Sequence, residues 1–123
     1  MSKRQTKIVL CIGSGAIELN LRSGLQHDCG WHVLSAVSGS EGVLRFSREK
    51  VDAVVIDLDT DGSEAALITG ELKRQRPEVP VVLLFNNEKL LAQGATDQAD
   101  AVVLKKDEAS RLPGVLDRLV RKA

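Results

Sequence analysis

The sequence predicts a single α/β domain in which helices cover both faces of a parallel β-sheet. The chain has 123 residues, fewer than the roughly 150 of a typical domain. Short apolar runs recur five times, and segments with helical periodicity lie between them. Continuous runs of Val, Ile and Leu suit strands that are buried on both faces. Because such strands alternate with helices, we expect parallel pairing through right-handed crossovers and a three-layer sandwich.

The apolar runs are the expected strands. They comprise residues 8–12, 33–37, 53–56, 81–85 and 101–104. The second run contains Ser35 and is the most mixed, as expected of a strand at the edge of the sheet. Because both sheet faces should be covered, we expect burial of five strand residues, namely Val54, Ile56, Val82, Leu84 and Val103.

Three of the intervening segments have apolar residues at helical spacing. In chain order the stripes are Ile17, Leu21 and Leu25; Ala65, Ile68 and Leu72; and Leu112, Leu116, Leu119 and Val120. Ser63 and Ser110 are the expected N-caps of the second and third helices. Gly30 and Pro77 are the expected ends of the first and second. Pro113 would then be the third residue of the last helix, where its missing N–H removes no intrahelical bond.

The composition excludes several classes of function. Lys and Arg number 17, as do Asp and Glu, so the net charge is zero, and binding of nucleic acid or an anionic membrane through bulk charge is not expected. No apolar run approaches the roughly 20 residues that span a bilayer. Two cysteines are too few for a disulfide framework, which favours reduced thiols and a cytoplasmic location.

Two charged residues draw attention to the carboxyl ends of the expected strands. Functional sites of open parallel sheets lie in the crevice beyond these ends. Asp57 follows the third apolar run and Lys105 follows the fifth. Lys105 is the cation expected to reach across the sheet end to Asp57. No arrangement of a nucleophile beside a base indicates a hydrolase, so we do not expect an enzyme.

Four segments resemble the receiver domains of two-component response regulators. They are residues 7–11 (KIVLC), 51–58 (VDAVVIDL), 76–83 (RPEVPVVL) and 99–105 (ADAVVLK). The resemblance covers nearly all of the chain and identifies residues 1–123 as one receiver-like domain. It implies a flavodoxin-like (βα)5 fold with strand order 2-1-3-4-5. It also implies that Asp57 occupies the phosphoacceptor position and Lys105 the position of the family's lysine.

The chain departs from that family's pattern at the pocket. The acidic pair after the first strand, which holds Mg²⁺ in the family, corresponds here to Ile12 and Gly13. The switch Ser or Thr corresponds to Phe85, the switch aromatic to Val102, and the proline after the lysine to Lys106. The loop that follows the phosphoacceptor is also different and reads DTDGS at residues 59–63.

These departures predict a degenerate receiver. Mg²⁺ is usually held by one or two carboxylates together with phosphate, and it supplies much of the charge stabilisation in phosphoryl transfer. Asp57, even helped by Asp59, is expected to bind Mg²⁺ only weakly, and phosphorylation is expected to be weak or absent. Changing Ile12 and Gly13 to Asp, and Phe85 to Thr, is then expected to raise the yield of phosphorylation.

The leading functional hypothesis is a signalling domain that contacts a histidine kinase or an output protein, as a monomer or a homodimer. An alternative is a constitutive pseudo-receiver that acts only as a protein-interaction module. A more distant alternative is a nucleotide or small-ligand site at the turn of Gly13, Ser14 and Gly15. An EF-hand starting at Asp57 is disfavoured, because its twelfth position would be Ile68 in place of Glu.

Overall fold

A computed structural model describes residues 7–13, 31–58, 62–85, 98–104 and 108–122. The predicted helix around residues 17–25 lies outside these ranges. The described elements are, in chain order, β1 (Lys7–Ile12), β2 (Trp31–Ala36), α2 (Gly39–Arg48), β3 (Ala53–Leu58), α3 (Gly62–Gln75), β4 (Val81–Phe85), β5 (Ala101–Leu104) and α4 (Glu108–Lys122).

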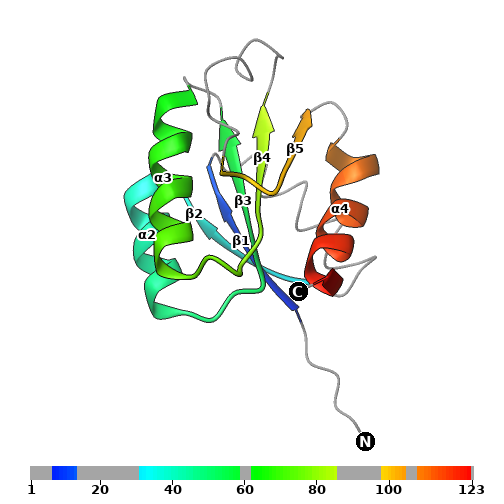
Figure 1. The fold of residues 1–123 in the computed structure, drawn as a ribbon, viewed down its shortest axis with the longest axis horizontal. Helices are drawn as coiled ribbons and strands as arrows, with labels where there is room; N and C mark the ends of the chain where they lie inside the picture. The colour runs from blue at the N-terminus through cyan, green and yellow to red at the C-terminus, as the bar shows by residue number, and fades with distance from the viewer. Residues whose placement is uncertain (1–6, 14–30, 59–61, 86–97, 105–107, 123) are drawn as a thin grey trace, which may run out of the picture.

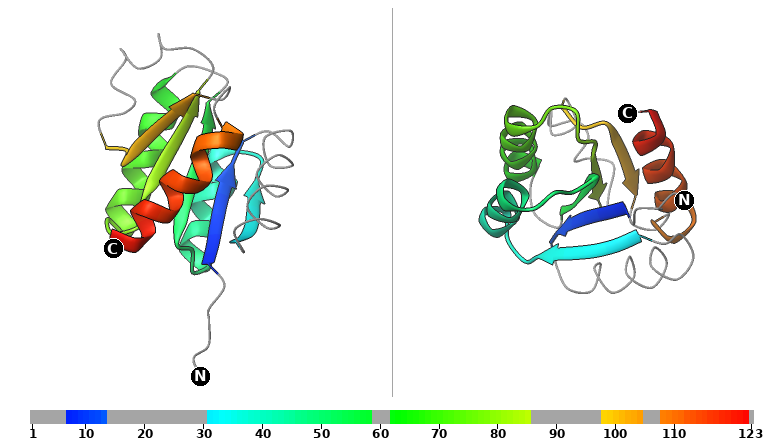
Figure 2. Two further views of the ribbon diagram at one scale, coloured as in Figure 1. Left: turned by 90° about the vertical axis from the view of Figure 1, so that its right-hand side faces the viewer. Right: turned by 90° about the horizontal axis from the view of Figure 1, so that it is seen from below.

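The strands form one parallel sheet in the order β2-β1-β3-β4-β5, which confirms the predicted fold class (Figure 1). β2 is an edge strand, as its mixed composition predicts. β3 lies at the centre, between β1 and β4. Helices α2 and α3 lie side by side on one face of the sheet, and α4 lies on the other (Figure 2). In the part of the chain that the structure describes, no helix combines the length and apolarity needed to cross a membrane.

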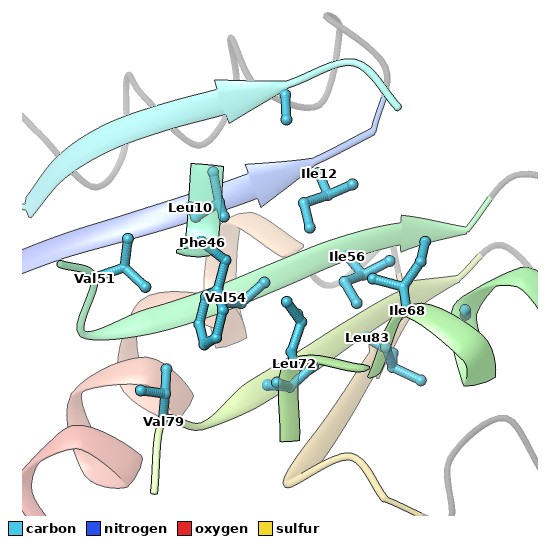
Figure 3. Close-up of a cluster of buried hydrophobic side chains, with 13 residues drawn as sticks. Leu10, Ile12, Phe46, Val51, Val54, Ile56, Ile68, Leu72, Val79 and Leu83 are labelled. Carbon is cyan, nitrogen blue, oxygen red and sulfur yellow. The ribbon is translucent and has the colours of Figure 1, made fainter. Parts of the chain in front are cut away.

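Alternate strand residues build two hydrophobic clusters, one on each face of the sheet. Val54 and Ile56 belong to the cluster beneath α2 and α3, which we call the α2/α3 cluster (Figure 3). Val82, Leu84 and Val103 belong to the cluster beneath α4, which we call the α4 cluster. All five residues are buried, as predicted.

Helix α2 is not among the helices that the apolar spacing predicts. Two side chains nevertheless accept hydrogen bonds from backbone N–H groups at its start. Ser38 is the N-cap and its hydroxyl accepts a hydrogen bond from the Glu41 N–H at 3.2 Å. The Glu41 carboxylate reaches back to accept from the Val37 N–H at 3.2 Å. This Ser-x-x-Glu spacing is a capping-box signature, so the start of α2 was readable from the sequence.

Several predicted boundaries are wrong. α3 begins at Gly62, so Ser63 lies inside its first turn. α4 begins at Glu108, so Ser110 is also internal and Pro113 is the sixth helical residue instead of the third. An acid at the first position suits the positive end of the helix dipole and favours this earlier start. Its consequence is that Pro113 leaves one carbonyl of the first turn without its usual N–H partner.

Two strand boundaries also shift. β2 begins at the buried Trp31 and ends at Ala36, leaving Val37 75% exposed, whereas the sequence predicted residues 33–37. β3 continues through Leu58, so Asp57 lies within the strand and pairs in register with Leu84. Continuation of the backbone ladder to β4 explains the longer strand, because pairing depends on the partner as well as on apolar composition.

The entrances to β3 and β5 carry the same aspartate clamp. The Asp52 N–H donates to the Ile8 carbonyl at 2.7 Å, and the Asp52 carboxylate accepts from the Ile8 N–H at 2.7 Å. Asp100 makes the equivalent pair of bonds with Val81, both at 2.8 Å. Lys73 of α3 also binds the Asp100 carboxylate at 2.6 Å. Each clamp therefore joins the start of one strand to its neighbour.

Removing either carboxylate is expected to destabilise the fold. Asp52→Ala and Asp100→Ala should each lower the free energy of unfolding by about 1–3 kcal/mol, because each leaves a backbone N–H without its acceptor. Urea denaturation measures the change. Asp52→Asn, which keeps an oxygen acceptor, should cost less than Asp52→Ala. The side chain of Asp117 is 44% exposed and pairs with Lys7, and Asp117→Ala should cost no more than about 1 kcal/mol. Equal losses for the alanine variants of Asp52 and Asp117 would contradict the clamp.

Candidate functional site

Asp57 lies in β3, one residue before its carboxyl end and at the centre of the sheet. Asp57 as a whole is partly exposed, but its Oδ1 atom is buried. Side chains alternate along a strand, so Asp57 lies on the same face as Ala53 and Val55, which belong to the α4 cluster. The central strand therefore presents one carboxylate at the edge of the sheet where functional sites of parallel sheets form.

Gly13, the residue that follows β1, is the direct neighbour of Asp57. The register between β1 and β3 pairs Ile12 with Ile56, and one further residue along each strand brings Gly13 beside Asp57. Gly13 has a φ of +148°, a region that side-chain-bearing residues rarely adopt. Its N–H donates to the Ala36 carbonyl of β2 at 2.9 Å. The end of β1 is thus held between β2 and Asp57.

The backbone of Gly13 approaches Asp57 more closely than a side chain would allow. A Cβ atom built on Gly13 would lie 2.5 Å from the Asp57 Cβ and 3.3 Å from its Cγ. Real Cβ atoms essentially never show contacts below 3.0 Å. The family pattern marks Gly13 only as a missing acid, and the close contact with Asp57 is the packing reason for a glycine here.

The Ile12 side chain does not face Asp57, although the family pattern aligns position 12 with a residue of the pocket. Its side chain is 3% exposed and belongs to the α2/α3 cluster, on the opposite face of the sheet from Asp57 (Figure 3). Gly42 of α2 lies against it, since a Cβ on Gly42 would come within 2.4 Å of the Ile12 Cδ1. The two-residue period of β1 was the sequence signal that separates Ile12 from Gly13.

The other predicted site residues are described only in part. Val102 is partly buried against the α2/α3 cluster. Phe85 ends β4 and pairs in register with Leu104, and its backbone alone is described. Lys105, Lys106, Asp59 and the turn residues Ser14 and Gly15 lie outside the described residues. Within the described ranges, no three His, Cys, Asp or Glu side chains lie together as a metal site would require.

Several solved receiver domains share this arrangement. The response regulator TrrA of Thermotoga maritima, solved with Mg²⁺ and BeF, superposes with a TM-score of 0.81 at 22% identity, covering 94% of this chain and 99% of that one. The signal receiver domain of an HD-domain protein from Pseudomonas fluorescens Pf-5 gives 0.84 at 14% identity, covering 99% and 92%. The chain has the receiver fold. At these identities the likeness to the solved structures is a likeness of fold alone.

Sequence comparison finds shorter similarity to two transcriptional regulatory proteins. No protein-family model matches the chain. The transcriptional regulatory protein GlrR of Escherichia coli K12 is 38% identical over 55 residues, which is 45% of this chain and 12% of GlrR. The transcriptional regulatory protein QseF of Escherichia coli O157:H7 matches to the same extent. The matched segment is thus a small part of each regulator.

Proposed function

We propose that this chain is a receiver domain of a response regulator, which acts in two-component signalling through protein contact and takes little or no phosphate. Asp57 is its phosphoacceptor position and Lys105 the position of the family's lysine. The observation that supports this most directly is the position of Asp57 at the carboxyl end of the central strand of a receiver fold. The similarity to GlrR, a transcriptional regulatory protein, adds support for a regulatory role.

The chemistry of the pocket supports the weak or absent phosphorylation. Gly13, which follows β1 and lies beside Asp57, carries no ligand atom on a side chain, and the Ile12 side chain is buried in the core. Asp57 with Asp59 would be the carboxylates left to hold Mg²⁺, which needs octahedral oxygen ligands and gives up its water reluctantly. Phe85 at the end of β4 has no hydroxyl with which to bind a phosphoryl oxygen. Val102 departs from the family at the position of the switch aromatic, and Lys106 departs at the position of the proline after the lysine.

Under this proposal the partners are a histidine kinase or an output protein, the location is the cytoplasm, and neither nucleic acid nor membrane is bound directly. A homodimer is compatible with the proposal. The second candidate is a pseudo-receiver that never takes phosphate and acts only by protein contact. It is favoured by the side-chain-free position at Gly13, where the family places an acid.

Incubation with a small phosphodonor and Mg²⁺ tests the proposal. We expect little or no stable acyl phosphate by intact mass, because Gly13 and Ile12 supply no second carboxylate for the metal. Asp57→Asn is the control that identifies any modified site. A small yield that disappears in Asp57→Asn would indicate a weakened receiver, and no yield would indicate the pseudo-receiver. A high yield on wild-type Asp57 would contradict the degenerate pocket.

A further inference from the structure

The ends of β1 and β3 are in direct contact at Gly13 and Asp57. Besides the 2.5 Å to the Asp57 Cβ, a Cβ on Gly13 would lie 3.4 Å from the Asp57 Cα. A rotation of the Asp57 side chain cannot relieve this contact, because the position of a Cβ atom depends only on the backbone. Room for any side chain at position 13 therefore requires the two strand ends to separate.

Separation of these strand ends is opposed from both sides. The Gly13 N–H is bound to the Ala36 carbonyl of β2 at 2.9 Å. Immediately before Gly13 and Asp57, the ladder pairs Ile12 with Ile56, and both side chains are buried in the α2/α3 cluster. The positive φ of Gly13 adds a second requirement for glycine, since other residues are strained there.

We propose that Gly13 is a positioning residue for the Asp57 carboxylate. The absence of a side chain lets β1 close against Asp57 and seats the carboxylate with Oδ1 buried. It follows that position 13 cannot supply a metal ligand while Asp57 keeps this position. An acid introduced there would displace the acceptor carboxylate that it was meant to assist. This inference rests on the proposed function only in treating Asp57 as the acceptor position.

The chain offers two matched glycine controls. Gly42 is packed as tightly as Gly13, with 2.4 Å from a built Cβ to the Ile12 Cδ1, but its contact is on the opposite face from Asp57. Gly114 of α4 has no atom within 4 Å of a built Cβ. Gly42→Ala therefore measures the effect of adding a Cβ atom at a tightly packed glycine away from Asp57. Gly114→Ala measures the effect of replacing glycine by alanine where there is open space.

Carbodiimide labelling of carboxylates in the full chain tests the proposal. Labelling of Asp57 is measured by peptide mass spectrometry relative to Asp117, whose side chain is 44% exposed. We expect Gly13→Ala to raise this ratio by about tenfold, equivalent to about 1.4 kcal/mol against the closed arrangement. Gly42→Ala and Gly114→Ala should leave the ratio near that of wild type. A folded Gly13→Ala with an unchanged ratio, or an equal rise in Gly42→Ala, would overturn the proposal.

A second measurement applies even where Gly13→Ala folds poorly. Asp57→Gly removes the Cβ that the new side chain would meet, so the loss of stability from Gly13→Ala should be smaller in the Asp57→Gly background. Equal losses in both backgrounds would overturn the proposal. Neither measurement involves phosphate. The coupling between Gly13 and Asp57 can thus be present in a chain that is never phosphorylated. It can also be absent from a chain that is phosphorylated.

Discussion

Ile12→Asp is expected to destabilise the protein by about 4 kcal/mol or more, in place of creating a metal ligand. Ile12 is 3% exposed, and its neighbours in the α2/α3 cluster are apolar. A carboxylate there would lose its hydration and would gain no partner among them, while the cluster would lose an aliphatic side chain. Since domains are stable by about 5–15 kcal/mol, this loss approaches the whole stability of the fold. The midpoint of urea denaturation measures it.

Ile12→Val is the matched control, because it deletes one methyl group without adding charge. It should cost about 0.5–1.5 kcal/mol. It should also reduce the loss caused by Gly42→Ala, since the Ile12 Cδ1 is the atom nearest to a Cβ on Gly42. An Ile12→Asp variant as stable as Ile12→Val, with tight Mg²⁺ binding, would show that position 12 can reach the pocket. In this structure, acids at positions 12 and 13 are expected to disturb the core and the Asp57 carboxylate before they can raise phosphorylation.

Phe46→Ala is expected to cost about 3–5 kcal/mol. Phe46 of α2 is 1% exposed and is the largest fully buried side chain of the described core. The Arg76 guanidinium lies 4.1 Å from the centre of its ring. Arg76 also donates to the Phe46 carbonyl, and to the Glu49 carbonyl at 3.2 Å, at the end of α2. The ring thus fills the core and supports the arginine that joins the end of α3 to the end of α2.

Thermal or urea unfolding followed by circular dichroism measures this loss. Phe46→Leu keeps most of the apolar volume and should cost clearly less than Phe46→Ala. Arg76→Lys keeps the charge but removes the planar group that lies over the ring, and it should cost less again. If Phe46→Ala and Arg76→Lys lowered the stability equally, the ring would contribute little beyond its contact with Arg76.

The layered fold was predictable because its strands are continuous apolar runs. Residues 81–85 and 101–104 were predicted with the boundaries that β4 and β5 have. β4 is buried on both faces and β5 is partly buried, and a continuous apolar run marks each of them. The predicted starts of α3 and α4 are wrong, because serine is a common N-cap but not a necessary one. The start of α2 is marked in the sequence by Ser38 and Glu41, and not by the apolar spacing that predicts the other helices.

The sequence by itself determined the parallel α/β sandwich and the position of Asp57 near the end of the central strand. The sandwich follows from local composition and from the alternation of strands and helices, and the central place of the Asp57 strand follows from the resemblance to receiver domains. Only the tertiary structure decided what Ile12 and Gly13 do. The absence of the family's acids at these positions does not show which contacts the isoleucine and the glycine make instead. Ile12 packs against Gly42, which is 30 positions along the chain. Gly13 packs against Asp57 from a neighbouring strand, and such contacts between distant residues arise only when the sheet and helices come together.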